Sequence, residues 1–520
     1  FAHGIYVLSK GLVSLLNFDS KSNSLNGVLV DNSGGTAGVT ISSTLENWIN
    51  SITGNGLGGL ELRSKGAILV NTVEAASNHG HGALLDNSGW LSAAGVTVKN
   101  SRFNKNDFSG LTIRTRGLVL VQNTSADLND SLSANGGYSG MELDNSTGTG
   151  TINVNSTTTS LRYSFSGNGG YGILAVSKGF VSISNFIANG NAEMGVKVTN
   201  DGSLGAPGVT LMRLTANGNY DTGIYVRSKG PILLDSAEAV GNVGDGADLD
   251  NCLFDGSLCR GTGSLTIKAP SGVLNIFSRN VISGLLVSTR GSILLTNVVA
   301  DRNNAYGALL RNDYPLTSTA VMINYAGNVF NSFSGNGFMN NNDGLKITTF
   351  GTITLSRIIA SNNYGKGANL DNSYAPFGRA VAVTDSTFNG NNSEGLLIWT
   401  DGAVNLVGTS ANFNGVFRGI LDASGATLTD RIAGDKGGDW WSFIVAADTP
   451  VFITMSSSAY DPYLALYDED DRLVAENDDI SPSDNTAKLE LVLTEPGMYT
   501  LFATSFDFAA YSRLVEGMYV

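Results

Sequence analysis

The feature that most constrains this chain is an internal repeat that runs through roughly its first four-fifths. A segment of the type G-(I/L)-x-(V/I)-x-(S/T)-(K/R)-G occurs eight times, with its first glycine at Gly4, Gly59, Gly110, Gly172, Gly223, Gly284, Gly344 and Gly395. A second type, G-x-x-(L/V)-(D/x)-N, begins at Gly27, Gly82, Gly140, Gly195, Gly246, Gly307 and Gly367, with a degraded copy at Gly419. The two types alternate, so each repeat of 51–62 residues holds two segments.

Within each first-type segment the apolar residues alternate with polar ones, which is the periodicity of a β-strand. The second residue after the inner glycine is always β-branched, as in Val13, Ile68, Val119, Val181, Ile232, Ile293, Ile353 and Val404. Two positions further on the residue is always apolar, as in Leu15, Val70, Val121, Ile183, Leu234, Leu295, Leu355 and Leu406. A helix would require apolar residues three and four positions apart, and that spacing is missing.

These patterns predict an all-β protein in which residues 1–425 form a right-handed parallel β-helix of about fifteen coils, two to each repeat. The composition agrees, because 65 of 520 residues are glycine, only 9 are proline and 15% are charged. The pattern resembles the parallel β-helix repeat family of pectate lyases, tailspikes and bacterial surface proteins. That resemblance implies the fold, while the family's functions extend from enzymes to adhesins and structural proteins.

An asparagine precedes the leading glycine by four residues in thirteen coils. These residues are Asn23, Asn55, Asn78, Asn106, Asn168, Asn191, Asn219, Asn242, Asn280, Asn303, Asn340, Asn363 and Asn391. Asparagine tolerates the backbone of a sharp corner, and stacked carboxamides can hydrogen-bond from one coil to the next. We therefore expect a structural ladder of asparagines along one corner.

Charged residues also recur at fixed positions. First-type segments end in Lys10, Lys65, Arg116, Lys178, Lys229 and Arg290, and second-type segments end in Asp31, Asp86, Asp144, Asp250 and Asp371. Alternating coils would place bases and acids alternately along one corner. The pattern predicts a surface salt-bridge ladder that sets the coil register, with a cation-binding or glycan-binding stripe as the alternative.

Residues 428–520 have a different composition and predict a small antiparallel β-sandwich. The expected strands include Asp439–Phe443, Val451–Met455, Leu464–Tyr467, Leu489–Leu493 and Tyr499–Ala503. Together with Tyr460–Leu466, Glu476–Asp479 and Pro496–Thr500, they give this part a resemblance to the bacterial pre-peptidase C-terminal domain. That family is found at the C-termini of secreted enzymes and surface proteins, and some members bind calcium or polymeric substrates.

Two further features of the sequence suggest chemistry in an extracellular setting. Asp461, Asp478 and Asp479, with other acidic residues near them, could supply the oxygen ligands that calcium prefers, or could simply be solvated turn residues. The only cysteines, Cys252 and Cys259, lie in one loop-like insertion, where a disulfide is expected and two free thiols are the alternative.

Catalytic motifs are missing from the sequence. The three histidines, His3, His79 and His81, are far along the chain from any matching acid and nucleophile, and no H-E-x-x-H or G-x-S-x-G segment occurs. A polysaccharide lyase is harder to exclude, because β-helix lyases are similar in placing carboxylates and bases on neighbouring coils. Arg63, Arg114 and Asp86 could form such a group, but the same arginine position recurs at Arg227, which favours a structural role.

The net charge of −14 disfavours nucleic acid and anionic membranes as partners, and no apolar run is long enough to span a bilayer. We expect an extracellular structural or adhesive surface protein. The alternatives are a glycan-binding protein, for which Tyr6, Tyr171, Tyr225, Tyr306 and Tyr364 are candidate contacts, and the lyase.

Self-association is the partner interaction that the sequence suggests. The repeat begins within three residues of Phe1, so we expect a first strand whose edge needs a partner. A head-to-tail contact between Phe1–Leu12 and residues 428–520, or the last coils, of another copy would build a filament.

Overall fold

The computed structural model describes residues 1–89, 94–130, 137–157, 162–200, 207–252, 263–312, 319–373, 379–412, 439–445, 448–457, 460–468, 472–481 and 484–506, with residues 254, 255, 258, 259, 261, 375, 414, 419 and 420 between them. The chain divides into two compact units, Phe1–Asn412 and Phe413–Val520. The predicted boundary at residues 425–428 lies outside the described residues.

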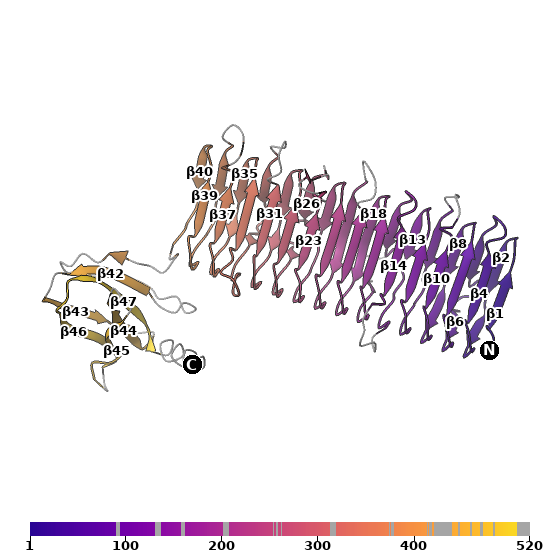
Figure 1. Cartoon of the computed structure of the whole chain (residues 1–520), viewed down its shortest axis with the longest axis horizontal. Helices are drawn as coiled ribbons and strands as arrows, with labels where there is room; N and C mark the ends of the chain where they lie inside the picture. Colours follow the sequence, from indigo (N-terminus) through magenta and orange to yellow (C-terminus); the bar gives the residue numbers. More distant parts are fainter. Residues whose placement is uncertain are drawn as a thin grey trace. The chain divides into compact units, whose positions relative to one another are not determined.

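The first unit is a parallel β-helix of fifteen coils, as the repeat predicts (Figure 1). Every coil contributes one strand to sheet A, in which each strand pairs in parallel with those of the coils before and after it. Its strands are β1 (Ile5–Leu8), β4 (Val28–Asn32), β7 (Leu60–Ser64), β10 (Ala83–Asp86), β12 (Leu111–Arg114), β14 (Met141–Asn145), β17 (Ile173–Ser177), β19 (Val196–Asn200), β21 (Ile224–Ser228), β23 (Ala247–Asp250), β28 (Leu285–Ser288), β31 (Ala308–Asn312), β34 (Leu345–Thr349), β37 (Ala368–Asp371) and β39 (Leu396–Trp399).

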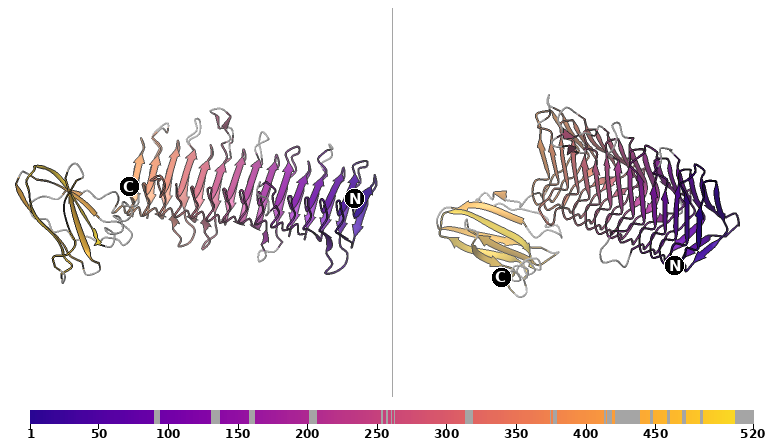
Figure 2. Two further views of the ribbon diagram at one scale, coloured as in Figure 1. Left: turned by 60° about the horizontal axis from the view of Figure 1, so that its bottom comes forward. Right: turned by 45° about the vertical axis from the view of Figure 1, so that its right-hand side comes forward.

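A second strand from every coil forms sheet B, and the two further views in Figure 2 show the strands stacked in the same order along this unit. Its strands are β2 (Val13–Leu16), β5 (Val39–Ser42), β8 (Ile68–Asn71), β11 (Val96–Lys99), β13 (Val119–Gln122), β15 (Ile152–Asn155), β18 (Val181–Ile187), β20 (Val209–Thr215), β22 (Ile232–Asp235), β26 (Leu265–Lys268), β29 (Ile293–Thr296), β32 (Val321–Asn324), β35 (Ile353–Ser356), β38 (Val381–Thr384) and β40 (Val404–Val407).

The third side of the coils is a thinner and interrupted sheet. Its strands are β3 (Asp19–Lys21), β6 (Asn50–Thr53), β9 (Val73–Ala76), β16 (Tyr163–Ser164), β27 (Asn275–Ile276), β30 (Val298–Val299), β33 (Asn331–Ser332) and β36 (Ile358–Ile359). In the other coils single β-bridges, such as Glu74 with Arg102 and Arg102 with Ser125, continue the pairing.

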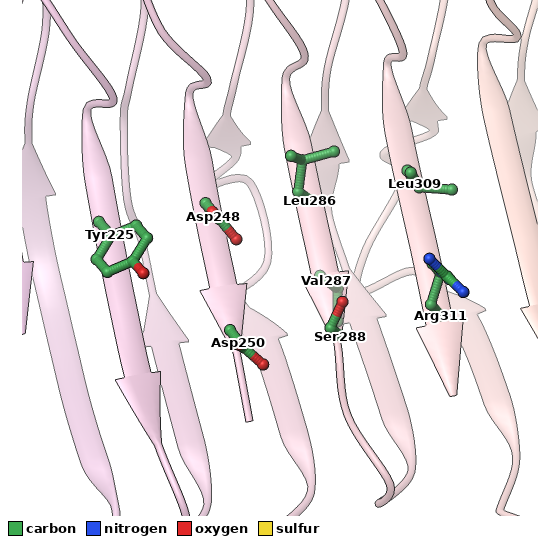
Figure 3. A pocket seen from close by; sticks show the side chains of 8 residues that line it. All are labelled: Tyr225, Asp248, Asp250, Leu286, Val287, Ser288, Leu309 and Arg311. Carbon is green, nitrogen blue, oxygen red and sulfur yellow. The ribbon is translucent and has the colours of Figure 1, made fainter. Parts of the chain in front are cut away.

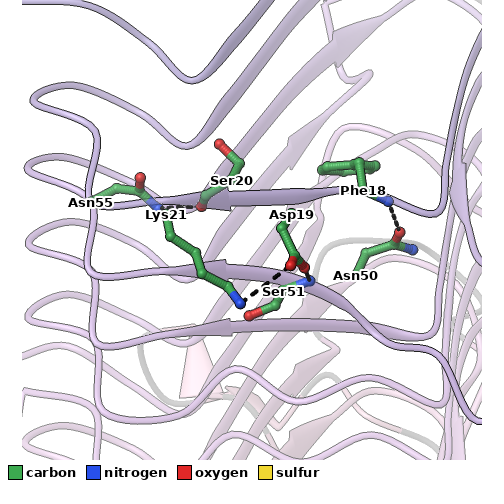
Figure 4. A network of polar contacts seen from close by, with 7 residues as sticks. All are labelled: Phe18, Asp19, Ser20, Lys21, Asn50, Ser51 and Asn55. Atoms are coloured by element: carbon green, nitrogen blue, oxygen red, sulfur yellow. Dashed lines mark hydrogen bonds and ion pairs between the residues drawn. The ribbon is translucent and has the colours of Figure 1, made fainter.

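Hydrogen bonds between side chains and the main chain join the third sides of the first coils (Figure 4). The Asn50 carboxamide oxygen accepts a hydrogen bond from the main-chain N–H of Phe18 at 2.9 Å. Asp19 in β3 accepts one from Lys21 Nζ and one from the main-chain N–H of Ser51, both at 3.3 Å. These contacts satisfy polar groups where the strand ladder is short.

The core of this unit is built from the inward residues of all three sides. Except in the first and last coils, strands of sheets A and B bury their first and third residues, as in Ile293 and Leu295 of β29. On the third side, large and small residues alternate in complementary fashion. Phe103 follows the small Ser101, whereas Ala75 follows the larger Val73, and this exchange keeps the interior filled at each level.

A column of buried asparagines runs along the corner before sheet A. Each carboxamide N–H donates to the carboxamide oxygen of the next coil, at 2.8–3.2 Å, in the order Asn23, Asn55, Asn78, Asn106, Asn129, Asn168, Asn191, Asn219, Asn242, Asn280, Asn303, Asn336, Asn363 and Asn391. Two details differ from the expectation. Asn129 belongs to the ladder, and Asn336 occupies the place assigned to Asn340, because insertions lengthen the corner in these two coils.

The corner between sheets A and B explains why the two segment types alternate. In second-type coils an inward asparagine donates across the loop that follows its strand, as Asn87 does to the carbonyl of Ala94 at 2.7 Å. In first-type coils a serine or threonine takes this place, and Thr115 Oγ1 donates to that same carbonyl at 3.2 Å. Asn145, one coil further on, donates to the carbonyl of Gly117 at 3.0 Å.

Most strands of the second unit pair in antiparallel fashion, and they share an apolar core. One sheet has the order β41 (Gly419–Ile420), β42 (Asp439–Val445), β47 (Gly497–Ser505), β44 (Pro462–Tyr467) and β45 (Leu473–Asn477), and β43 (Thr449–Met455) pairs with β46 (Ala487–Leu493). Leu464 and Leu501 of the first sheet pack in one cluster with Leu489 and Leu493 of the second. This arrangement is consistent with the predicted small sandwich.

Candidate functional site

The candidate site is the outer face of sheet A, formed by the second and fourth residues of its strands. Fourteen of these thirty residues are charged: Asp31, Glu61, Arg63, Asp86, Arg114, Glu142, Asp144, Lys197, Arg227, Asp248, Asp250, Arg311, Lys346 and Asp371. On the outer face of sheet B, the same two positions carry only Lys99, Asp235 and Lys268 as charged residues among thirty. Both faces belong to the same coils, so the difference lies in the chemistry that they display.

In the middle of this face is a shallow depression, which we call the central depression (Figure 3). It is lined by Tyr225, Asp248, Asp250, Leu286, Val287, Ser288, Leu309 and Arg311. The register places Tyr225 beside Asp248 on neighbouring strands, and it places Ser288 between Asp250 and Arg311. The floor is low where the short side chains of Asp248 and Ser288 lie between longer neighbours.

The acids of the central depression are electrostatically unusual. Burial, together with the negative charges of Asp245 and Asp250, raises the pKa of Asp248 to about 7, although Arg227 acts in the opposite direction. Burial also raises the pKa of Asp245. Arg227 Nε lies 3.5 Å from an Asp250 carboxylate oxygen. The depression therefore holds one carboxyl group that exchanges its proton near neutral pH, with cations on both sides.

Tyrosines and lysines border the central depression on the same face. Lys197 Nζ lies 3.1 Å from the Tyr171 hydroxyl, 4.9 Å from the centre of the Tyr171 ring and 5.9 Å from that of Tyr225. Lys346 Nζ lies 5.9 Å from the centre of the Tyr306 ring. Burial raises the pKa of Tyr171 and Tyr225, so both hydroxyls stay protonated at neutral pH.

The five candidate tyrosines therefore share one side of the β-helix. Tyr6 and Tyr225 are second residues of sheet A strands, and Tyr171 and Tyr306 stand directly before the leading glycine of their coils. Tyr364 lies slightly further back, directly after the ladder residue Asn363. These tyrosines are far apart in the sequence because each coil places only one short segment on this side of the β-helix.

The structure also brings together the three residues considered for a lyase. Asp86 in β10 is in register with Arg63 of β7 on one side and with Arg114 of β12 on the other. However, Asp86 Oδ1 accepts hydrogen bonds from the N–H and hydroxyl of Ser88, at 2.9 and 2.7 Å, and thereby caps its own turn. Arg63 Nη2 lies 2.7 Å from Glu61 Oε1. These contacts support a structural role.

The predicted alternation of basic and acidic residues along one corner was wrong by two positions. Asp31 and Asp86 are in register with Arg63 and not with Lys65, because the acid is the fourth residue of its strand and the lysine follows the strand end. Asp31 Oδ1 instead accepts two hydrogen bonds from Ser33, which lower its pKa. The recurring acids are therefore turn caps.

A cluster of aromatic residues near the same face was not predicted from the sequence. The rings of Phe108 and Tyr138 are stacked, with centres 4.3 Å apart, and His81 meets both rings edge-on. Burial lowers the pKa of His81, so the ring is neutral at physiological pH. The signal that could have found this cluster is the insertion between Asn129 and Gly140, which breaks the spacing of the repeat.

The remaining candidate residues lie elsewhere. His79 Nδ1 lies 2.7 Å from an Asp107 carboxylate oxygen, and His3 Nδ1 accepts a hydrogen bond from the main-chain N–H of Asn26. Cys252 is fully buried beside the hairpin of β24 (Phe254–Asp255) and β25 (Leu258–Cys259). The side chain of Cys259 lies outside the described residues, so the disulfide stays a prediction.

The acidic residues of the second unit do approach one another. Desolvation, together with the negative charges of Asp461, Asp478 and Asp484, raises the pKa of Asp479. One carboxylate oxygen of Asp461 and one of Asp479 are closed to solvent and accept no hydrogen bond from the described residues. Within the same described part of the chain, however, no three histidine, cysteine or acidic side chains are close enough to hold a metal ion.

No family model matches the chain, and no curated protein matches it. Among solved structures, two A-modules of mannuronan C-5 epimerases from Azotobacter vinelandii are similar. The AlgE4 module is 13% identical, with 78% of this chain and 91% of that chain covered and a TM-score of 0.33. The AlgE6 module is also 13% identical, with 78% of this chain and 90% of that chain covered and a TM-score of 0.34. The fold described above rests on the sheets and register of this chain, and the likeness assigns no site.

No helix within the described ranges is both long and apolar enough to cross a lipid bilayer.

Proposed function

We propose that this protein is an extracellular surface protein that binds a polysaccharide across the outer face of sheet A. One observation carries the proposal: fourteen of thirty outward residues on sheet A are charged, against three of thirty on sheet B. Five of the fourteen, Asp31, Asp86, Asp144, Asp250 and Asp371, cap the turns after their strands. The other nine still exceed the three on sheet B, although core packing and strand pairing impose the same demands on both outer faces. This remaining excess of charge indicates a ligand for the outer face of sheet A.

The side chains of this face suit the groups that a sugar presents. Tyr171 and Tyr225 offer ring surfaces beside Lys197, and the apolar face of a pyranose can pack on such rings. Asp250 and Arg311 border the central depression and can pair with hydroxyl groups through charge-assisted hydrogen bonds. Successive coils repeat these groups about 4.8 Å apart, so an extended chain could bridge several coils.

The second unit supports an extracellular location through its resemblance to the pre-peptidase C-terminal domain. The same resemblance suggests calcium, and Asp461 and Asp479 offer carboxylate oxygens without hydrogen-bond partners among the described residues. A divalent cation there would relieve the mutual repulsion of these acids. It would stabilise this unit while leaving the outer face of sheet A unchanged.

The test is a glycan array that contains neutral and uronate polysaccharides, followed by calorimetry with the best ligand. Tyr225→Ala and Arg311→Ala should each weaken binding by about tenfold, which corresponds to the loss of one stacking or charge-assisted contact. The matched controls are Leu233→Ala and Lys268→Ala, at the equivalent outward positions of sheet B. Equal losses in the test and control variants would remove the basis of the proposal.

A second candidate is catalysis on the same polysaccharide, and the pKa of Asp248 near 7 favours it. A carboxyl group with that pKa can take or give a proton at neutral pH, and general acid–base catalysis needs this property. Incubation with uronate polysaccharides, with unsaturated products monitored by absorbance, tests a lyase reaction. Activity that survives in Asp248→Asn would exclude this residue as the proton carrier.

The head-to-tail filament stays a prediction. Among the described residues no strand pairs with the outer edge of β1, and further coils or another copy would satisfy its main-chain groups equally well. Electron microscopy of purified protein distinguishes a polymer from single particles.

A further inference from the structure

One insertion into the repeat lies outside the outer face of sheet A. In most coils the ladder asparagine precedes the leading glycine by four residues, whereas Asn336 precedes Gly344 by eight. The additional residues form a turn over residues 338–341. This inserted turn lies directly against the next coil, since any side chain at Gly365 would collide with the main chain of Asn341 and Asn342. The main-chain N–H of Gly365 also donates to the carbonyl of Asn342 at 3.1 Å.

The inserted turn forms one wall of a depression, which we call the corner pocket. It is lined by Asn341, Tyr364, Gly365, Lys366, Asn392 and Ser393, from three consecutive coils. Asn341 has a φ of 50°, a left-handed conformation that asparagine tolerates, and this holds the turn in place. The Phe338 ring, 5.3 Å from that of Tyr364 and perpendicular to it, supports the Tyr364 ring from the side of the inserted turn.

Several polar groups in the corner pocket are available to a ligand. The carboxamides of Asn341 and Asn392 and the hydroxyl of Tyr364 make no hydrogen bond with any described residue. Tyr364 is 39% exposed, so part of its ring is also accessible. Each carboxamide provides both donors and an acceptor, a combination that matches the hydroxyl groups of a sugar.

The charges of the corner pocket cancel. Lys366 Nζ lies 3.1 Å from Glu394 Oε2, and the Ser393 hydroxyl donates to the same oxygen at 2.6 Å. These contacts lower the pKa of Glu394 to about 2, so the pair stays ionised and neutral overall across the physiological range. A charged ligand would therefore meet no unpaired charge of opposite sign in the Lys366–Glu394 pair.

We propose that the corner pocket binds one neutral pyranose residue of a polysaccharide, with the Tyr364 ring packed on the sugar and Asn341 and Asn392 bonded to its hydroxyls. Functional groups should break a structural repeat, and this pocket exists only because of an insertion. The inference does not rest on the central depression, since the corner pocket lies at the corner that precedes sheet A and is lined by residues of other coils.

The experiment uses the full chain and three probes, the neutral hexasaccharides of glucose linked β-1,4, glucose linked α-1,4 and mannose linked β-1,4. A hexagalacturonate serves as the charged comparison, and saturation-transfer NMR and calorimetry measure binding. We expect at least one neutral hexasaccharide to bind, and Tyr364→Ala to weaken that binding by about tenfold or more. Asn392→Ala should weaken it by a smaller factor.

The matched control is Tyr220→Ala. Tyr220 directly follows the ladder residue Asn219, as Tyr364 follows Asn363, and it is 72% exposed, but no inserted turn lies beside it. Failure of all three neutral probes, binding of hexagalacturonate alone, or equal affinity in Tyr364→Ala and wild type would each overturn the inference. If circular dichroism shows that Tyr364→Ala is misfolded, the exposed Asn392→Ala variant decides instead. Variants of the central depression should leave this binding intact, so failure of one proposal is distinguishable from failure of the other.

Discussion

Sheets A and B are built by the same coils, pair their strands in the same parallel manner and bury alternate residues in all but the first and last coils, yet their outer faces differ. The outward residues of sheet B are mostly serine, threonine, asparagine and leucine, and none of them is aromatic. Those of sheet A include Tyr6, Tyr225 and Trp399 in addition to fourteen charged residues. Sheet B therefore shows what the fold requires of an exposed strand, and sheet A carries further charged and aromatic residues in addition to the aspartates that cap its turns.

The comparison separates stability from recognition. Apart from the aspartates that cap the turns after sheet A, a residue that serves the fold should have counterparts in both sheets, whereas a residue that serves a ligand should be confined to one. By this criterion the inward Ile293 of β29 is structural, because every coil has an equivalent in each sheet. Asp248 has no equivalent on sheet B, where the second residue of the strand in the same coil is Thr266.

The largest expected effect comes from a charge placed in the shared core. Ile293→Asp should destabilise the β-helix by on the order of 3–5 kcal/mol, because an unpaired carboxylate would be buried between neighbouring coils. Leu294→Asp, one residue along on the outer face of sheet B, should be tolerated. Thermal melts followed by circular dichroism compare the two variants. Equal melting temperatures would mean that β29 does not face inward as described.

The next effect concerns the asparagine ladder, which both faces share. Asn129→Ala should lower the free energy of unfolding by about 1–3 kcal/mol, because Asn106 would lose the acceptor for both its main-chain and its side-chain N–H. Below its melting temperature, this variant should still bind the polysaccharide at the outer face of sheet A. The control is Asn392→Ala, an exposed asparagine one residue beyond the ladder. If chemical denaturation gives the same stability for both variants, the ladder is not a stabilising element.

A pH-dependent effect is expected at the central depression. The folded protein raises the pKa of Asp248 to about 7, so between the unfolded value near 4 and pH 7 it keeps a proton that the unfolded chain has lost. Stability contributed by this group is present at low pH and disappears as the pH rises through 7. Asp248→Asn removes the buried charge and should stabilise the protein by about 1–3 kcal/mol at pH 8, with little change at pH 4. A stability difference independent of pH would contradict this account.

The smallest effect should appear in the second unit. Calcium at 1 mM should slow hydrogen exchange in β44 and β45 relative to chelator, because a cation would hold Asp461 and Asp479 together. The same addition should leave sheets A and B unchanged. Asp461→Asn should abolish the difference. If the hydrogen-exchange protection is the same with and without calcium, these acids are turn residues that do not bind the ion.

Much of the scaffold was predictable from the sequence because each coil repeats the same local physics. Ile68 and Ile293 begin strands in which every second residue is apolar, and this alternation is expected when one face of a strand lies against a core. The β-helix of fifteen coils that the pattern predicts is confirmed. The register of charged residues was not predictable to the residue, since Lys65 and Asp86 lie at segment ends that differ in length by two residues. Strand ends depend on hydrogen bonds made by the turn, such as those from Ser88 to Asp86.

The candidate sites were harder to predict because they depend on exceptions to the repeat. A spacing of four residues selected Asn340 for the ladder, whereas the structure uses Asn336 and turns the additional residues into a wall of the corner pocket. The longer insertion after Asn129 ends at Tyr138, whose ring stacks on Phe108. The raised pKa of Asp248 depends on acids from two strands, and no single segment of sequence contains that information.

The alternation at the corner between sheets A and B limits how this chain can change in length. Thr115 donates back to the loop of the coil before it, and Asn145 donates back to the glycine of the coil that carries Thr115. Removal of a single coil would bring two coils of one type together and leave a loop carbonyl without its donor. Removal of two consecutive coils would restore the pattern. Duplication and deletion in this array should therefore occur in pairs of coils, which makes the pair the heritable unit of this fold.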